Sequence, residues 1–183
     1  MLSVNTNQLE EIIWQSPKKK FAGSGKEVSE ALGRKPESTD LLERHPFDVE
    51  ILRLIPGQTP YPYHSHSMQW EFYHVISGHG AVRHEGGMSP INPGDAFLFK
   101  PGEPHQLTNN GKEDLVIYVV ADNPIGESTH YPDSNKWAVR SPEEKGFAFG
   151  KSGIFRRGGM ILGKGVTGKA QRPSSNLVIS FEL

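Results

Sequence analysis

Four residues with metal-binding side chains lie in two short stretches of this chain. His64, His66 and Glu71 occupy the first stretch, and His105 lies in the second. Residues two apart in a β-strand point to the same face, so His64 and His66 can present both imidazoles to one point. Three neutral imidazoles and one carboxylate leave coordination positions open for water or substrate, and they suit a first-row transition metal. The spacing therefore predicts a metal site built from two neighbouring β-hairpins.

Glu71 joins this group only if the backbone changes direction before it. It lies an odd number of positions beyond His66, which would turn it to the other face of a regular strand. We therefore expect a bend or a bulge within residues 67–70. The expected cofactor is one divalent transition metal ion, and manganese, iron, nickel, zinc and copper all fit this set of ligands.

The elements that must position these residues have the pattern of an antiparallel barrel or sandwich. From Phe47 to about Ala121, short β-rich runs alternate with turns that contain glycine, proline or asparagine. The expected strands cover residues 49–55, 71–76, 80–84, 96–99, 105–109 and 115–121. Because no long helix interrupts the series, a parallel sheet with helical crossovers is not expected.

The segments on either side of the barrel differ from it in pattern. Residues 1–45 are expected to form an N-terminal extension with a short helix, for which Ser24-Gly-Lys-Glu27 is a capping box and Gly33 the stop signal. Residues 46–140 are expected to form the barrel with a closing loop, because the stretch after Ala121 lacks a strand period.

Residues 141–183 form a basic, glycine-rich C-terminal extension. From Lys145 onward there are seven lysine or arginine residues and a single acid, Glu182. This composition predicts a poorly ordered extension, and the alternative is an element that binds an anionic partner.

Composition limits the classes of function. A chain of 183 residues with 35% hydrophobic residues suits one domain. Its formal net charge of −1 gives no reason to expect nucleic acid or a membrane surface as a partner. The absence of cysteine excludes disulfides, thiolate nucleophiles and sulfur-ligated metal sites. Because no signal peptide and no apolar run of membrane-spanning length is found, we expect a cytoplasmic protein.

Taken together, the two stretches resemble the two signature motifs of the cupin superfamily. The residues that carry the resemblance are Gly57, His64, His66, Glu71 and Gly78 in the first motif, and Gly94, Gly102, His105 and Asn109 in the second. Lys100 stands where the second motif favours proline, a departure that affects a turn more than the ligands. The resemblance covers residues 47–121, and the flanking segments extend it to small single-domain bacterial cupins of unassigned activity.

The resemblance implies an all-β fold, an antiparallel double-stranded β-helix (jelly-roll) barrel with a short helical N-terminal extension. It places His64, His66, Glu71 and His105 on the ligand positions of one metal ion, and it does not indicate catalytic residues. The candidates for the wall of the substrate pocket are Tyr63, Tyr73, Gln69, Trp70, Gln106 and Arg53. The histidines at positions 74, 79 and 84 are expected on the surface or in turns.

Two classes of function follow. The first is a metal-dependent enzyme of the isomerase, decarboxylase or dioxygenase type, acting on a small carboxylate, keto acid or sugar derivative, because an open metal site can polarise a carbonyl group. The alternative is a non-catalytic cupin that binds a small sugar or acid. In either case a homodimer is expected, since the edge strands of such a barrel need cover.

Overall fold

Three antiparallel sheets form the framework of the chain, which this computed structural model describes for residues 1–36, 38–139, 147–150 and 153–156. The largest sheet has the strand order β1 (Ile12–Gln15), β2 (Ala22–Glu27), β3 (Phe47–Leu54), β10 (Leu115–Asp122), β5 (Glu71–Ser77), β8 (Ala96–Phe99). A second sheet has the order β14 (Gly153–Arg156), β13 (Phe147–Gly150), β12 (Lys136–Val139), β11 (Ser128–Tyr131), β4 (Ser65–His66). The third has the order β7 (Gly87–Ile91), β6 (Gly80–His84), β9 (His105–Thr108).

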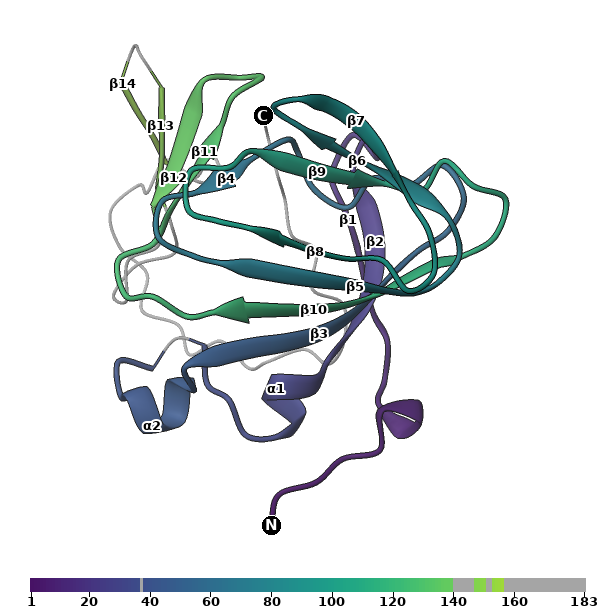
Figure 1. The fold of residues 1–183 in the computed structure, drawn as a ribbon. Coiled ribbons are helices and arrows are strands. Elements are labelled where there is room, and N and C mark those ends of the chain that lie inside the picture. Colours follow the sequence, from purple (N-terminus) through teal and green to yellow (C-terminus); the bar gives the residue numbers. More distant parts are fainter. Residues whose placement is uncertain (37, 140–146, 151–152, 157–183) are drawn as a thin grey trace.

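These sheets enclose one hydrophobic core. Figure 1 shows β6 and β9 on one side of the interior and β8, β5, β10 and β3 on the other. Both sides contribute buried side chains to the core, which are Trp14, Leu52, Leu54, Tyr73, Val75, Val82, Ile91, Leu107, Leu115 and Ile117. Removing such side chains from water contributes about 1.5–3 kcal/mol each. The expected all-β jelly-roll barrel is confirmed.

Short helices lie outside the barrel. These are η1 (Thr6–Gln8), α1 (Val28–Ala31) and α2 (Leu41–Arg44), and Figure 1 shows α1 and α2 on the outer side of β3. The Ser29 hydroxyl of α1 accepts a hydrogen bond from the Val49 N–H of β3 at 2.8 Å, which fixes the helix to the sheet. None of the described helices has the length and apolar character needed to span a bilayer.

The expected capping box at residues 24–27 is wrong. These residues continue β2, where β1 and β3 take up their backbone hydrogen bonds, and Glu27 makes no side-chain capping bond to α1. Pairing with two neighbouring strands therefore outweighs the local helix signal. Gly33 was expected after the helix, and it follows α1 with a φ of 98°, a backbone conformation that glycine adopts without strain.

The six expected strands between Phe47 and Ala121 are all present, with bounds that differ by at most two residues. The expectation of a loop after Ala121 is wrong, because β11 and β12 form a hairpin there. Strands β1, β2, β4 and β7 were not expected either. The basic extension from Lys145 onward lies largely outside the described residues, apart from β13 and β14.

Several motif residues shape the turns at the end of β5 and β9. Gly78 has a φ of 80°, and a Cβ atom there would lie 2.2 Å from the carbonyl oxygen of Asp114. Only glycine fits such a position. The buried amide of Asn109 donates hydrogen bonds to the carbonyl oxygens of Leu54 (2.7 Å) and Glu113 (2.8 Å), which ties β3 to the turn before β10. These motif residues therefore stabilise the barrel.

Candidate metal centre

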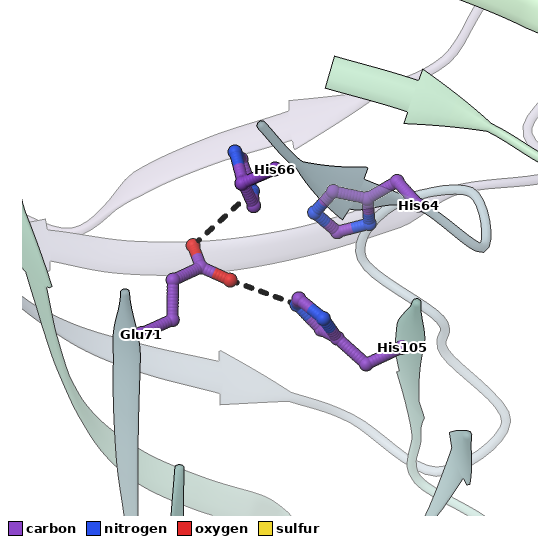
Figure 2. A group of neighbouring side chains, drawn as sticks. All are labelled: His64, His66, Glu71 and His105. Carbon is purple, nitrogen blue, oxygen red and sulfur yellow. Dashed lines mark ion pairs between the residues drawn. The ribbon is translucent and has the colours of Figure 1, made fainter. Parts of the chain in front are cut away.

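The four expected ligands lie next to one another in the structure, as Figure 2 shows. His64, His66, Glu71 and His105 each offer one ligand atom, and these atoms all lie within 4.8 Å of one another. His66 ends β4, Glu71 begins β5 and His105 begins β9, so the residues come from three different sheets rather than from two hairpins. His64 precedes β4 and exchanges both backbone hydrogen bonds with His105, at 3.1 and 2.8 Å.

The expected change of direction before Glu71 is confirmed. The chain bends at residues 67 and 68, leaves one sheet after His66 and enters another at Glu71. As a result the carboxylate returns toward the histidines despite the odd spacing. Its Oε2 lies 2.8 Å from His105 Nε2, and its Oε1 lies 3.5 Å from His66 Nε2.

The Nδ1 atoms of all three imidazole rings face acceptor oxygens, and those of His64 and His105 are hydrogen-bonded. Nδ1 of His64 lies 2.8 Å from the carbonyl oxygen of Pro62, and Nδ1 of His105 lies 3.1 Å from that of Glu103. Because a carbonyl oxygen only accepts, each of these Nδ1 atoms carries the hydrogen and donates it. Nδ1 of His66 faces a carboxylate oxygen of Glu127 at 3.4 Å. This arrangement turns the Nε2 atoms toward the cluster, as metal-binding histidines require.

The protonation states also suit a cation. Burial, followed by repulsion from His105 and His66, lowers the pKa of His64 to about 3, so its ring is neutral near pH 7. Burial alone would raise the pKa of Glu71, but its 2.8 Å contact with His105 Nε2 and the positive charge that the three neighbouring rings can carry in the absence of an ion hold it well below its usual value. Neutral imidazole nitrogen and ionised carboxylate oxygen are the donors that divalent transition metals bind. The residues present therefore fit such an ion.

Tyr73 is the expected wall residue that lies closest to these ligands. Its hydroxyl donates a hydrogen bond to Glu71 Oε2 at 2.9 Å and lies 3.4 Å from His105 Nε2. Burial and the neighbouring Glu71 carboxylate raise its pKa well above the usual value, so the hydroxyl keeps its proton. Tyr73 is thus a neutral donor beside the cluster.

The structure does not bring three other expected wall residues to the cluster. Arg53 lies between the inward-facing Leu52 and Leu54, so its side chain points out of the barrel, where it pairs with Glu11 and Asp114. The guanidinium of Arg83 covers the ring of Tyr63 at 3.8 Å. Gln106 alternates with the buried His105 and Leu107, and it donates to the carbonyl oxygen of Tyr61.

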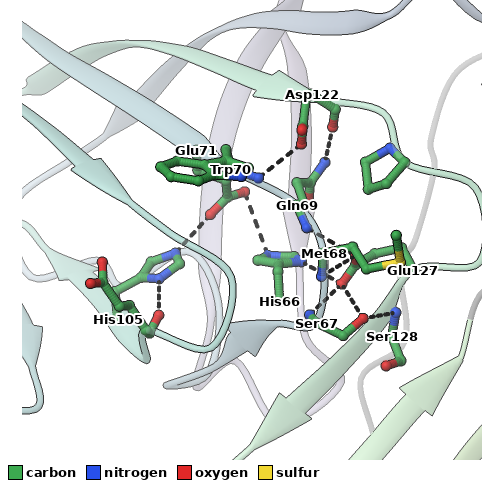
Figure 3. Close-up of polar contacts among 12 residues, drawn as sticks. His66, Ser67, Met68, Gln69, Trp70, Glu71, His105, Asp122, Glu127 and Ser128 are labelled. Carbon is green, nitrogen blue, oxygen red and sulfur yellow. Dashed lines mark hydrogen bonds and ion pairs between the residues drawn. The ribbon is translucent and has the colours of Figure 1, made fainter.

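Gln69 and Trp70 belong to the bend itself. The Gln69 side-chain amide donates to the carbonyl oxygen of Asp122 at 2.6 Å, and the Trp70 N–H donates to the Asp122 side chain at 2.8 Å. The Trp70 side chain is exposed. Both residues therefore attach the segment between two ligands to the end of β10, as Figure 3 shows.

Aromatic residues that the sequence reasoning missed surround the histidines. Phe99 stacks on His105 with ring centroids 4.1 Å apart, and Tyr61 and Tyr131 lie 6.3 and 6.2 Å from the ring of His64. The alternation of β8 could have indicated Phe99, which pairs with Glu71 in the sheet. Tyr131 gave no such signal, since its segment was expected to be a loop. The expectation for His74 is confirmed, because it is exposed on β5.

Comparison with known proteins gives the same fold from independent data. Residues 50–121 match the family model of the cupin domain. A curated relative, the oxalate-binding protein of Thermotoga maritima, is 32% identical over 69 residues, which are 38% of this chain and 56% of that protein. The match therefore spans just over half the length of this relative.

Solved structures extend the likeness beyond the matched segment. A sugar phosphate isomerase from a cupin superfamily, from Silicibacter pomeroyi, superposes with a TM-score of 0.69 at 22% identity, covering 82% of this chain and 94% of that one. A Thermotoga maritima protein described as a "predicted oxalate decarboxylase" has a TM-score of 0.54 at 19% identity, covering 67% of this chain and 99% of that one. At these identities the likeness establishes the fold alone.

Proposed function

We propose that this chain, which belongs to the cupin superfamily, binds one divalent transition metal ion and uses it to act on a small oxygen-rich molecule. His64, His66, Glu71 and His105 would hold the ion. The observation that carries the proposal is the common orientation of the three rings, each with Nδ1 facing an acceptor oxygen and Nε2 left toward the cluster. Such an orientation is costly to maintain in a protein interior unless the inner nitrogens have a use.

The ion would supply Lewis acidity toward a carbonyl or carboxylate oxygen of the substrate. The chain's own groups would do the rest. The Tyr73 hydroxyl, 2.9 Å from Glu71 Oε2, is a neutral donor beside the cluster for a substrate oxygen. Phe99, Tyr61 and Tyr131 offer apolar ring faces beside the histidines, which favour a small substrate and limit access of water.

We favour a carboxylate, keto acid or sugar derivative as substrate, with chemistry of the isomerase, decarboxylase or dioxygenase type. Support comes from the donor set of the cluster and from the names of two cupins of the same fold, a sugar phosphate isomerase and a predicted oxalate decarboxylase. A non-catalytic module that binds a small acid is the second candidate. The oxalate-binding relative favours it.

Metal content tests the first step. Elemental analysis of protein purified without chelator or metal-affinity tag should give about one transition metal ion per chain. His66→Ala and Glu71→Ala should lose most of this metal on dialysis, because each removes a ligand. His74→Ala is the matched control, since this histidine lies exposed on the same strand as Glu71, and it should keep the metal. Equal metal in all four proteins would contradict the proposed ligands.

A substrate panel separates the enzyme from the binding module. Both should show a rise in melting temperature with the right small acid or sugar, because a ligand that binds only the folded state stabilises it. Only an enzyme should also convert it, with a rate that depends on the metal supplied. Homodimerisation and a cytoplasmic location stay predictions, and light scattering in solution would test the first.

A further inference from the structure

The buried carboxylate of Glu127 contacts both His66, at the end of β4, and the bend that follows this strand, although it lies about 60 positions away in the sequence. Glu127 lies directly before β11, and its residue is only 6% exposed. Its Oε1 accepts a hydrogen bond from the Ser67 N–H at 2.8 Å, while Oε2 accepts from the N–H groups of Met68 and Gln69 at 3.0 and 3.1 Å. Three successive backbone amides thus converge on one side chain, as Figure 3 shows.

This convergence fixes the segment that reverses the chain between two ligands. Both oxygens of Glu127 accept from backbone N–H groups, and none of these three partners can accept a hydrogen in return, which is the arrangement of an ionised carboxylate. Backbone N–H groups that converge on an anion form a stable nest. Glu127 therefore holds residues 67–69 of the bend, while Asp122 holds residues 69 and 70.

The same carboxylate faces one nitrogen of His66. Glu127 Oε1 lies 3.4 Å from Nδ1, and on the other side of the ring Glu71 Oε1 lies 3.5 Å from Nε2. An ionised carboxylate has no hydrogen to give, so it favours the tautomer with the hydrogen on Nδ1. Nε2 then keeps its lone pair and points it at the cluster. Backbone carbonyls do this for the rings of His64 and His105, whereas His66 depends on a side chain.

We propose that Glu127 is a positioning residue of the metal centre, which holds His66 as the Nδ1–H tautomer and fixes the bend that returns Glu71 to the histidines. The inference deepens the proposed function and rests on it for the identity of the ligand, a divalent transition metal ion. Its effect on the ring, however, is a property of the metal-free protein and is measurable there.

Glu127→Gln tests the proposal with little change in shape. A glutamine has one oxygen and one NH2 group, so it cannot accept from the three backbone amides and from His66 as the carboxylate does. If its NH2 faces Nδ1, the hydrogen of His66 moves to Nε2. We expect affinity for zinc, measured by competition with a chelating dye, to fall about 10–100-fold, as for other partners of metal-binding histidines.

Asp122→Asn provides the matched control. Its carboxylate accepts from the Trp70 N–H in the same bend, and among the described residues its polar contacts do not reach a ligand ring. A purely structural role for both acids predicts equal losses of affinity, whereas the proposal predicts a clear loss in Glu127→Gln and near wild-type affinity in Asp122→Asn. Equal losses in the two variants would overturn the inference.

The tautomer itself is the second readout. Long-range nitrogen–proton NMR spectra of metal-free protein labelled with ¹⁵N-histidine, assigned with His66→Ala, should show Nδ1–H in the wild type. They should show a shift toward Nε2–H for His66 alone in Glu127→Gln. If that variant does not fold, Glu127→Asp, which keeps the charge, should retain the Nδ1–H form. An unchanged His66 in Glu127→Gln, or an Nε2–H form in the wild type or in Glu127→Asp, would overturn the inference. A wild type with this tautomer but no affinity for any transition metal would overturn the proposed function instead.

Discussion

Beside α1, three carboxylates lie as close together as the four ligands of the metal centre do. Glu27, Glu30 and Asp48 form this acidic cluster, and their ligand atoms also lie within 4.8 Å of one another. Arg34 pairs with Glu30 and, at 3.0 Å, with Asp48. Burial, together with Glu30 and Asp48, raises the pKa of Glu27 to about 7. The protein itself therefore offsets most of the negative charge of the acidic cluster, through the Arg34 guanidinium and through a proton that Glu27 binds up to about pH 7.

The metal centre has the opposite design. Among the described residues, no lysine or arginine forms an ion pair with its carboxylate, and its histidine rings are anchored on their outer nitrogens. Closeness of acidic and imidazole groups is therefore a poor guide to a metal site by itself. How the surrounding groups balance charge and orient lone pairs is a better one.

Removing the cation from the acidic cluster should have the largest effect on stability. Arg34 has a side chain that is only 4% exposed, so Arg34→Met removes a buried cation from two partly buried carboxylates. We expect a loss of about 3 kcal/mol in the free energy of unfolding, measured with urea. Lys35→Met is the control, because Lys35 and its partner Glu43 are exposed and such pairs contribute little. A loss no larger than that of the control would show that the carboxylates do not need Arg34.

The raised pKa of Glu27 predicts a smaller effect on the free energy of unfolding, and this effect depends on pH. The pKa of Glu27 is raised to about 7 in the folded state, against 4.5 for an ordinary glutamate. The folded state thus binds this proton more tightly, so its contribution is complete below pH 4.5 and is lost as the pH rises through about 7. Relative to Glu27→Gln, the wild type should lose on the order of 2 kcal/mol across this range. Parallel stability curves for the two proteins would contradict the shared proton.

The smallest expected effect concerns the acidic cluster, which should give no rise in melting temperature when metal is added. Manganese or zinc should raise the melting temperature of the wild type, because the ions bind only the folded metal centre. In the double variant His66→Ala, Glu71→Ala the acidic cluster is unchanged, and we expect no rise. A rise that persists in the double variant would mean that the acidic cluster binds metal as well, and the contrast between the two clusters would disappear.

The sequence predicted the parts of the site whose signals are local. His64 and His66 share a face because of their spacing, and the strands that carry Glu71 and His105 were recognisable from turns and apolar runs. The bend before Glu71 was predicted because Glu71 lies an odd number of positions after His66, which in a regular strand would turn it to the opposite face. Each of these inferences depends on residues within a few positions of one another.

The parts that failed depend on distant partners. Arg53 points outward because Leu52 and Leu54 face the core, and it then pairs with Glu11 and Asp114. Local sequence cannot reveal partners so far along the chain. The β11 and β12 hairpin was missed because all four residues of β11 are only partly buried, so the strand lacks an alternating apolar pattern. Glu127 was missed because it directly precedes this unrecognised strand.

The origin of the ligands in three sheets links the site to the lifetime of the fold. β4, β5 and β9 belong to separate hydrogen-bonded units, and near the cluster the isolated bridge between His64 and His105 joins two of them. An ion bound as proposed would cross-link all three units. Release of the ion and separation of the sheets would then be coupled, so metal scarcity would shorten the survival of the chain against proteases.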